Sequence, residues 1–318
     1  MNDLHHDIAL LTTNEGREII STDLAINLII RAEWLFPQLF SFHDVLKIYE
    51  LIDLRSSCKL FSRSLTPPPL YTVFPTSKHV HMQSLVNRLD ELHQSSCGKA
   101  VPSLLLIEEG EHFLPIDHDS CVEINFPLSL TGAGRGKSIL KFGLRIRGEK
   151  NDSGVVEISD LTICSAQDDG LFAYYGMKIL VRKCSILNCI TDGVSAVGVD
   201  IFCDDLQVVG CGRNGVWAAN NATITLSGEN TRVLSNAKSG NSGSYGLCAY
   251  SSKIQLVALT KEKISIYNDG GGNWGTRSRG TIEQIDNNGS ILKIWQAEDN
   301  ESEDESESSN EDNYFGDY

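Results

Sequence analysis

A repeat of about 22 residues in the second half of the chain limits the possible fold more than any other feature of the sequence. Each copy is marked by a glycine followed by Leu or Val, and the four copies begin at Gly170, Gly193, Gly215 and Gly246. Successive glycines are 23, 22 and 31 residues apart, and an alanine lies three residues after each one. Because side chains alternate along a strand, the pattern predicts a short strand whose aliphatic residue and alanine face the same side.

Two further families of short strands recur between these glycine-marked strands. The inward pairs expected in the second family are Ile179/Val181, Ile201/Cys203, Ile224/Leu226 and Ile254/Leu256. Those expected in the third family are Leu161/Ile163, Cys184/Ile186, Leu206/Val208, Thr231/Val233 and Ile264/Ile266. Stacked units would pair every strand with its equivalents about 4.8 Å above and below, and would bury these side chains. We therefore expect an all-β fold, a right-handed parallel β-helix with three strands in each coil.

Other repeat folds fit the sequence less well. A leucine-rich repeat has one strand per unit and a Leu/Asn framework that is missing here, and a propeller needs blades of about 40–45 residues. Asn188, Asn236 and Asn268 each follow a third-family strand. They predict a partial ladder of amide side chains at one corner of the stack.

The repeat sets the expected domain limits. We assign residues 99–295 to the β-helix, with the most regular coils from about Ser153 to Asn236. A longer loop, Ala237 to Tyr245, precedes a final coil that we expect to end near Trp274. Residues 296–318 are low-complexity and acidic, and they are expected to form a disordered tail.

Residues 1–98 have a helical pattern instead. We expect helices over 23–36, 43–65 and 79–93, and the second must stop at the proline run that begins with Pro67. The third has an amphipathic face, formed by Met82, Leu85, Val86, Leu89 and Leu92. An uncovered first coil would expose sheet edges and apolar columns, so this helical region is expected to cap the β-helix.

Charge and cysteine content narrow the function classes. The net charge is −15, and residues 298–318 carry ten acidic residues and no Lys or Arg. No basic surface is predicted, so we expect no nucleic-acid partner and no membrane binding. Met1 to His6 lacks the features of a secretory signal, which predicts an intracellular protein, cytoplasmic or nuclear. The nine cysteines show no zinc-site spacing and are expected to be free thiols, with no metal or cofactor.

Residues 127–140, Pro-Leu-Ser-Leu-Thr-Gly-Ala-Gly-Arg-Gly-Lys-Ser-Ile-Leu, resemble the early coil of pectin-lyase-like proteins. Glu109-Gly110 resembles a strand start in the same family. The segments Gly243–Leu247 and Asp269–Gly275 resemble the last coil and its exit in right-handed β-helix repeat proteins of unicellular eukaryotes. The resemblance covers roughly residues 100–285. It implies a fold but not a function, because one fold hosts many functions.

Residues 42–61 resemble a degenerate F-box helix pair. Phe42-His-Asp-Val-Leu46 and Ser57-Cys-Lys-Leu-Phe61 stand where F-box proteins have an aliphatic run and a Val-Cys-Lys stretch. Ser57 replaces the valine, and the spacing between the two stretches is longer than in that family. The resemblance would imply a ubiquitin-ligase substrate adaptor that binds a Skp1-type protein through residues 35–65.

Two acidic residues are the candidates for catalysis. Asp169 and Asp192 would lie one coil apart, as the paired carboxylates of β-helix hydrolases do. Asp-Gly is also a common turn sequence, however, and both aspartates precede a strand where a turn is needed. We therefore favour a structural role for this pair, and an enzyme is less expected than a binding protein.

Other chemistry finds less support. Asp200, Asp204 and Asp205 are too few for the six to eight oxygens of a calcium site. His79 and His81 show no metal spacing and are expected to diverge on a helix.

Four aromatic residues are the candidates for binding, and they would lie outward on one or more coil faces: Tyr174, Tyr175, Trp217 and Tyr250. They could equally be surface fillers. Our leading expectation is a non-enzymatic binding or adaptor protein with a protein partner. The alternative is a carbohydrate-active enzyme, a polygalacturonate lyase or glycoside hydrolase, with a polysaccharide substrate. Ser302, Ser308 and Ser309 each have an acid three residues on, as acidophilic kinase sites do.

Overall fold

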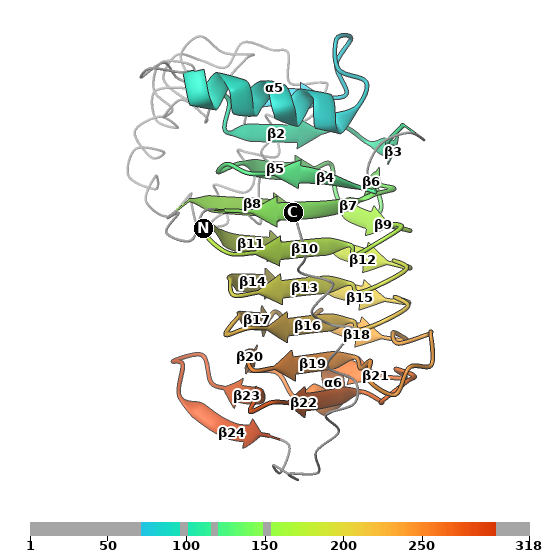
Figure 1. The fold of residues 1–318 in the computed structure, drawn as a ribbon, viewed down its shortest axis with the longest axis vertical. Coiled ribbons are helices and arrows are strands. Elements are labelled where there is room, and N and C mark those ends of the chain that lie inside the picture. Colours follow the sequence, from blue (N-terminus) through green and yellow to red (C-terminus); the bar gives the residue numbers. More distant parts are fainter. Residues whose placement is uncertain (1–70, 96–100, 116–119, 149–153, 297–318) are drawn as a thin grey trace, which may run out of the picture. The chain divides into compact units, whose positions relative to one another are not determined.

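A computed structural model describes residues 71–95, 101–115, 120–148 and 154–296 of the chain. The chain divides into two compact units, Met1–Pro68 and Pro69–Tyr318, and every described residue belongs to the second. The helices expected over 23–36 and 43–65, the F-box-like segment and the acidic tail lie outside the described residues. The described part is a parallel β-helix, with three strands in each coil (Figure 1).

Three sheets run along the stack, and consecutive strands of the chain go from sheet 1 to sheet 3 and then to sheet 2. Sheet 1 contains β1 (Tyr71–Phe74), β2 (Leu104–Ile107), β5 (Ser129–Gly132), β8 (Val155–Ser159), β11 (Lys178–Arg182), β14 (Asp200–Asp204), β17 (Thr223–Ser227), β20 (Lys253–Val257), β23 (Thr281–Ile285) and β24 (Ile291–Trp295). Sheet 2 contains β4 (Cys121–Ile124), β7 (Gly143–Arg147), β10 (Leu171–Tyr174), β13 (Val194–Val197), β16 (Val216–Ala219), β19 (Leu247–Tyr250) and β22 (Trp274–Arg277). Sheet 3 contains β3 (Gly110–His112), β6 (Ser138–Leu140), β9 (Thr162–Cys164), β12 (Ser185–Leu187), β15 (Gln207–Val209), β18 (Arg232–Leu234) and β21 (Ser265–Ile266).

The four glycine-marked strands are β10, β13, β16 and β19 of the seven-stranded sheet 2, in the register that the repeat predicts. Parallel pairing aligns Ala173 with Ala196, Ala218 and Ala249, and all four alanines are buried. The second family forms sheet 1, where Ile179 aligns with Ile201, Ile224 and Ile254. These continuous columns of small and aliphatic side chains form the core of the stack.

The third family forms sheet 3, and its last member differs from the expectation. Val233 pairs with Ser265, so the buried Ser265 takes the inward position, while Ile266 pairs with Leu234. The reason is the short helix α6 (Lys261–Ile264), which takes up the residues just before β21 and shifts the register by one. Ile264 is still buried, but it belongs to the helix.

The amide ladder exists, but Asn188 is not part of it. Asn236 Oδ1 accepts a bond from the Cys211 N–H at 3.0 Å, and Asn236 Nδ2 donates to Asn268 Oδ1 at 3.0 Å. Asn188 lies one position earlier, at a corner where the backbone is left-handed (φ 54°) and where Ser235 is its equivalent. Asn is one of the few residues that adopt this conformation readily, which accounts for its presence there. The prediction for Asn188 was wrong by one residue.

The first coil begins earlier than expected and is covered by a helix. β1 lies inside the segment that was expected to be helical, and α5 (Met82–Ser95) follows it, close to the helix expected over 79–93. The apolar face of α5 is buried against the first coils through Met82, Leu85, Val86 and Leu89. Gln83 also pairs with edge strand β4, because its Oε1 accepts from the Glu123 N–H at 2.8 Å. The helix therefore caps both the core and a sheet edge.

At the other end of the stack, the last coil extends beyond Trp274, near which it was expected to end. Trp274 does not end the last coil but begins β22, and β23 follows in sheet 1. The chain then turns back, so that β24 pairs antiparallel with β23 and forms the final edge of sheet 1 (Figure 1).

Candidate functional site

The corner before sheet 2 brings Asp169 and Asp192 together, as their spacing predicts. Asp169 Oδ1 accepts a hydrogen bond from the backbone N–H of Asp192 at 2.9 Å, and it also accepts one from the Thr191 hydroxyl. Asp192 Oδ1 accepts in turn from the N–H of Asn214 at 2.6 Å and from its Nδ2 at 3.0 Å. Each side chain therefore binds the backbone of the equivalent residue one coil further on.

The same pattern continues beyond the two aspartates. Asn214 Oδ1 accepts from the N–H of Tyr245 at 2.8 Å, and Tyr245 precedes the last of the four repeat glycines. We call the side chains of Asp169, Asp192 and Asn214 the acid ladder. It supplies hydrogen-bond partners to backbone groups that the sharp corner leaves outside the sheets, and such groups are costly to bury unpaired.

Burial dominates the electrostatics of the acid ladder. Burial and, second, the neighbouring Asp169 carboxylate together raise the pKa of Asp192 to about 7, against the opposing effects of Arg213 and the Asn214 bonds. The pKa of Asp169 is also raised, by burial and despite its hydrogen bonds to Thr191 and Ser195. Two carboxyls this close in a low-dielectric site resist carrying two charges, so a proton is held there near neutral pH.

A raised carboxyl pKa is typical of a catalytic acid. The geometry here, however, leaves no carboxyl oxygen of Asp192 accessible to a substrate. Asp192 is 3% exposed, and its two oxygens accept bonds from Asn214 and Ser195. A glycosidase needs both carboxyls open to the sugar on either side of the scissile bond. The arrangement therefore supports the structural role that the turn position predicts.

The three aspartates near β14 do not converge on an empty cage. Asp204 Oδ1 accepts from the Ser227 hydroxyl at 2.9 Å, and Asp205 accepts from the N–H of Asn230 at 3.1 Å. Asp200 is exposed at the start of the strand. Among the described residues, no group of three or more His, Cys, Asp or Glu side chains is placed to hold a metal ion. Six of the described cysteines are free thiols: Cys164, Cys184, Cys189, Cys203, Cys211 and Cys248.

The four candidate aromatic residues all lie on the outer side of sheet 2 or at its edge. Tyr174 and Trp217 are half-buried at outward positions of β10 and β16, while Tyr175 and Tyr250 are 46% and 37% exposed. Phe172, which the sequence analysis missed, stacks on Tyr174 with ring centroids 5.3 Å apart. We call Phe172, Tyr174, Tyr175, Trp217 and Tyr250 the aromatic face.

Strand pairing places small residues between these aromatic side chains. In one outward row Phe172 pairs with Ser195, which pairs with Trp217. In the other row Tyr174 is followed by Val197, Ala219 and Tyr250. Successive rungs lie about 4.8 Å apart, so Phe172 and Trp217 stand about 10 Å apart across the short side chain of Ser195. The aromatic face therefore contains two rows in which smaller side chains separate the large ones.

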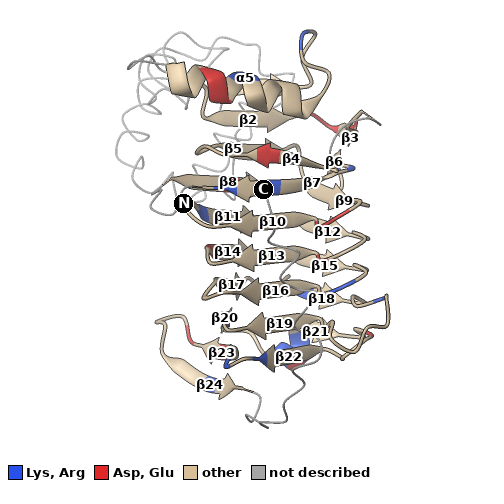
Figure 2. Cartoon of the chain, viewed as in Figure 1, with Lys and Arg blue, Asp and Glu red and all other residues tan. Residues whose placement is uncertain are grey.

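Arginines flank the aromatic face at both ends. Arg147 of β7 lies over the Tyr174 ring at 5.5 Å, and Arg277 of β22 is the strand partner of Tyr250. Arg145 of β7 is paired with Glu123 at 3.5 Å and with Asp168 at 3.6 Å. Figure 2 shows these basic segments on β7 and β22, with the acidic segment of β4 beyond β7. Arg213, in the loop before β16, is exposed as well.

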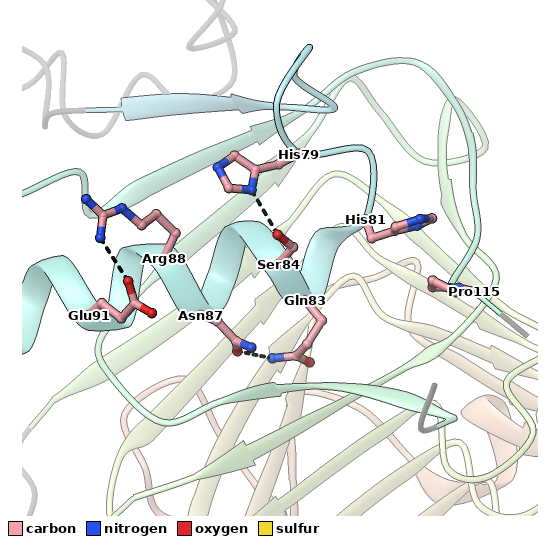
Figure 3. A pocket seen from close by; sticks show the side chains of 8 residues that line it. All are labelled: His79, His81, Gln83, Ser84, Asn87, Arg88, Glu91 and Pro115. Carbon is pink, nitrogen blue, oxygen red and sulfur yellow. Dashed lines mark hydrogen bonds and ion pairs between the residues drawn. The ribbon is translucent and has the colours of Figure 1, made fainter. Parts of the chain in front are cut away.

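A separate cavity of about 410 Å³ lies beside α5 (Figure 3). His79 and His81 both line it, but they precede the helix, and their rings point apart. His79 Nδ1 and Ser84 Oγ are 3.0 Å apart. A serine–histidine hydrogen bond of this kind is one part of the Ser-His-Asp triad of hydrolases. A triad also needs a carboxylate bonded to the histidine. Glu91, the acidic residue that lines this cavity, is paired with Arg88 at 2.8 Å instead.

Comparison of the chain with protein-family models, with curated proteins and with solved structures finds no match. The resemblances to pectin-lyase-like and F-box proteins therefore stay predictions. None of the described helices is long and apolar enough to cross a membrane.

Proposed function

We propose that this chain is a non-enzymatic binding protein and that the aromatic face of sheet 2 is its recognition surface. The observation that carries the proposal is that Phe172, Tyr174, Trp217 and Tyr250 lie in two adjacent rows on one outer sheet face. Aromatic side chains on a rigid scaffold are frequent hot spots of protein recognition. The solenoid supplies such a scaffold, because each coil is held by its two neighbours.

The arginines favour a particular partner chemistry. Arg147 and Arg277 are both exposed at the ends of the aromatic face, and arginine is suited to carboxylate recognition. The partner that fits is an acidic protein segment with aromatic residues of its own.

A random copolymer of glutamate and tyrosine is a suitable probe for this chemistry. Binding of the copolymer to the full chain, followed by fluorescence anisotropy, should weaken at least about tenfold in a Tyr174→Ala/Trp217→Ala variant. Phe202→Ala is the matched control, because Phe202 is an exposed aromatic residue on sheet 1 with Lys178 above its ring. Equal affinities for all three proteins would refute the proposal.

The adaptor version of this function adds a second contact. If residues 35–65 act as an F-box-like segment, the full chain should bind a purified Skp1-type protein. A Val45→Asp variant should lose that binding while keeping its affinity for the copolymer. If the unchanged full chain does not bind a Skp1-type protein, the adaptor version is wrong and the binding proposal is unaffected.

A carbohydrate-active enzyme is the second candidate function. The raised pKa of Asp192 is the observation in its favour. The test is incubation with polygalacturonate, with and without calcium, followed by assays for reducing ends and for unsaturated products. Turnover that disappears in an Asp192→Asn variant would establish the enzyme. We expect no turnover, because the Asp192 carboxyl is buried and its oxygens are bonded.

A further inference from the structure

We propose that the acidic segment, residues 298–318, binds back onto the aromatic face of its own chain and competes with the partner for it. This inference rests on the proposed function, because it names the regulation of the same surface. Its basis is the charge of the segment, the charge and chemistry of the face, and the distance between them.

The charges are complementary. The acidic segment carries ten carboxylates and no basic residue. Arg147, Arg213 and Arg277 are all exposed on or beside sheet 2. Arg277 belongs to β22, the last strand of sheet 2, and this is the end of the stack from which the chain leaves β24. The acidic segment is therefore tethered at the same end of the stack as Arg277.

The order of residues in the segment also matches the order of the surface. Nine of its ten acidic residues precede Tyr314 and Phe315, and Asp317 and Tyr318 follow these two. On sheet 2, the path from β22 toward β7 meets Arg277 first, then Tyr250 and Trp217, and finally the cluster around Tyr174. The acidic residues before Tyr314 would face Arg277, and the segment's aromatic residues would reach the aromatic face.

The tether is long enough for this path. β10 lies four rungs from β22 in sheet 2, which at about 4.8 Å per rung is about 19 Å. Tyr314 lies 16 positions after Glu298 in the sequence, a stretch that can span about 50 Å when extended. A short tether also gives a local concentration of the order of millimolar, so a weak interaction between segment and face suffices to occupy the site.

The first test places a photo-crosslinking benzoylphenylalanine at Phe315 of the full chain and maps the products by peptide mass spectrometry. We expect intramolecular products on β10, β13, β16 or β19. Their yield should fall at least fivefold in an Arg147→Glu/Arg277→Glu variant and at high salt, since the contact is electrostatic. Arg88→Glu on α5, which reverses another exposed arginine, should leave the yield unchanged.

Two results of this test would overturn the inference. One is a set of products that lie on sheet 1, on sheet 3 or on a second molecule. The other is a yield on sheet 2 that the arginine reversals leave unchanged.

A second test measures the competition itself. A full chain in which the ten acidic residues of the segment are replaced by Asn or Gln should bind the glutamate–tyrosine copolymer at least fivefold more tightly. If the unchanged chain binds the copolymer through Trp217 but this variant binds it with the same affinity, the segment does not compete with the partner. The binding proposal is unaffected by that result. If instead the protein gives the arginine-dependent cross-links but does not bind the copolymer, the binding proposal is wrong and the contact between segment and face remains.

Discussion

The β-helix contains two polar ladders that do the same structural work with different chemistry. The acid ladder lies before sheet 2, and the amide ladder, which links Cys211, Asn236 and Asn268, follows sheet 3. An amide both donates and accepts, so Asn236 satisfies a backbone N–H and the carbonyl of Val208 at once. A carboxylate only accepts, and it adds a charge that burial resists. The comparison shows that paired aspartates in a solenoid can serve to hydrogen-bond the backbone at a corner.

Breaking the amide ladder should have the largest effect on stability. An Asn236→Leu variant leaves the Cys211 N–H and the Val208 carbonyl without their buried partners, so we expect a loss of about 3 kcal/mol in the free energy of unfolding. Urea denaturation measures this loss. Asn188→Gly is the control, because glycine also adopts its left-handed backbone, and the change there should stay within about 1 kcal/mol. Similar losses in both variants would mean that the ladder bonds do not matter.

Extending the acid ladder should have the next largest effect. Asn214→Asp replaces the donor that Asp192 Oδ1 binds at 3.0 Å with another acceptor. We expect a loss of about 2 kcal/mol at pH 8 and a smaller loss at pH 5, where a proton on one carboxyl restores a donor. The measurement is urea denaturation at the two pH values. Equal losses at both pH values would show that the charge on the two carboxyls does not affect the stability of this corner.

Neutralising Asp192 in the acid ladder should have an effect on stability that depends on pH. The pKa of Asp192, about 7, lies above its ordinary value, so the folded state holds a proton that the unfolded state releases. The stability due to this group is present below about pH 4 and is lost as the pH rises through about 7. Asp192→Asn should therefore be about 1 kcal/mol more stable than the unchanged chain at pH 8 and no more stable at pH 4. A difference that does not vary with pH would contradict the raised pKa.

The smallest effect on stability is expected outside both ladders. Tyr250 is 37% exposed on the aromatic face, and Tyr250→Ala should lower the unfolding free energy by less than about 1 kcal/mol. The same variant should weaken binding of the glutamate–tyrosine copolymer several-fold. Thermal melts measure the stability and fluorescence anisotropy measures the binding, on the same preparation of the variant. A large loss of stability would assign Tyr250 to the fold instead.

The sequence predicted the parts of the fold that repeat. Inward residues recur in every coil, so the alanine column through Ala196 could be read from spacing alone. The errors fall where a residue leaves the repeat. Asn188 is displaced by a left-handed corner, and Ile266 is displaced by helix α6, which interrupts the strand pattern.

The candidate site was harder to predict for a related reason. The spacing placed Asp169 and Asp192 one coil apart, but it carried no information on their burial or on the bonds to Asn214. Phe172 was missed because outward positions are free to vary, so its neighbours in the row, Ser195 and Trp217, share no pattern with it. The alternation of β10 could have indicated Phe172, since it lies between two inward residues.

One comparison of affinities tests the central claim most directly, namely that function resides on the aromatic face while the aspartates brace the corner. The affinity of the full chain for the glutamate–tyrosine copolymer is measured for Trp217→Ala and for Asp169→Asn/Asp192→Asn. We predict a loss of binding in the first variant and unchanged binding in the second. Binding that survives in the first variant and disappears in a folded form of the second would contradict the account.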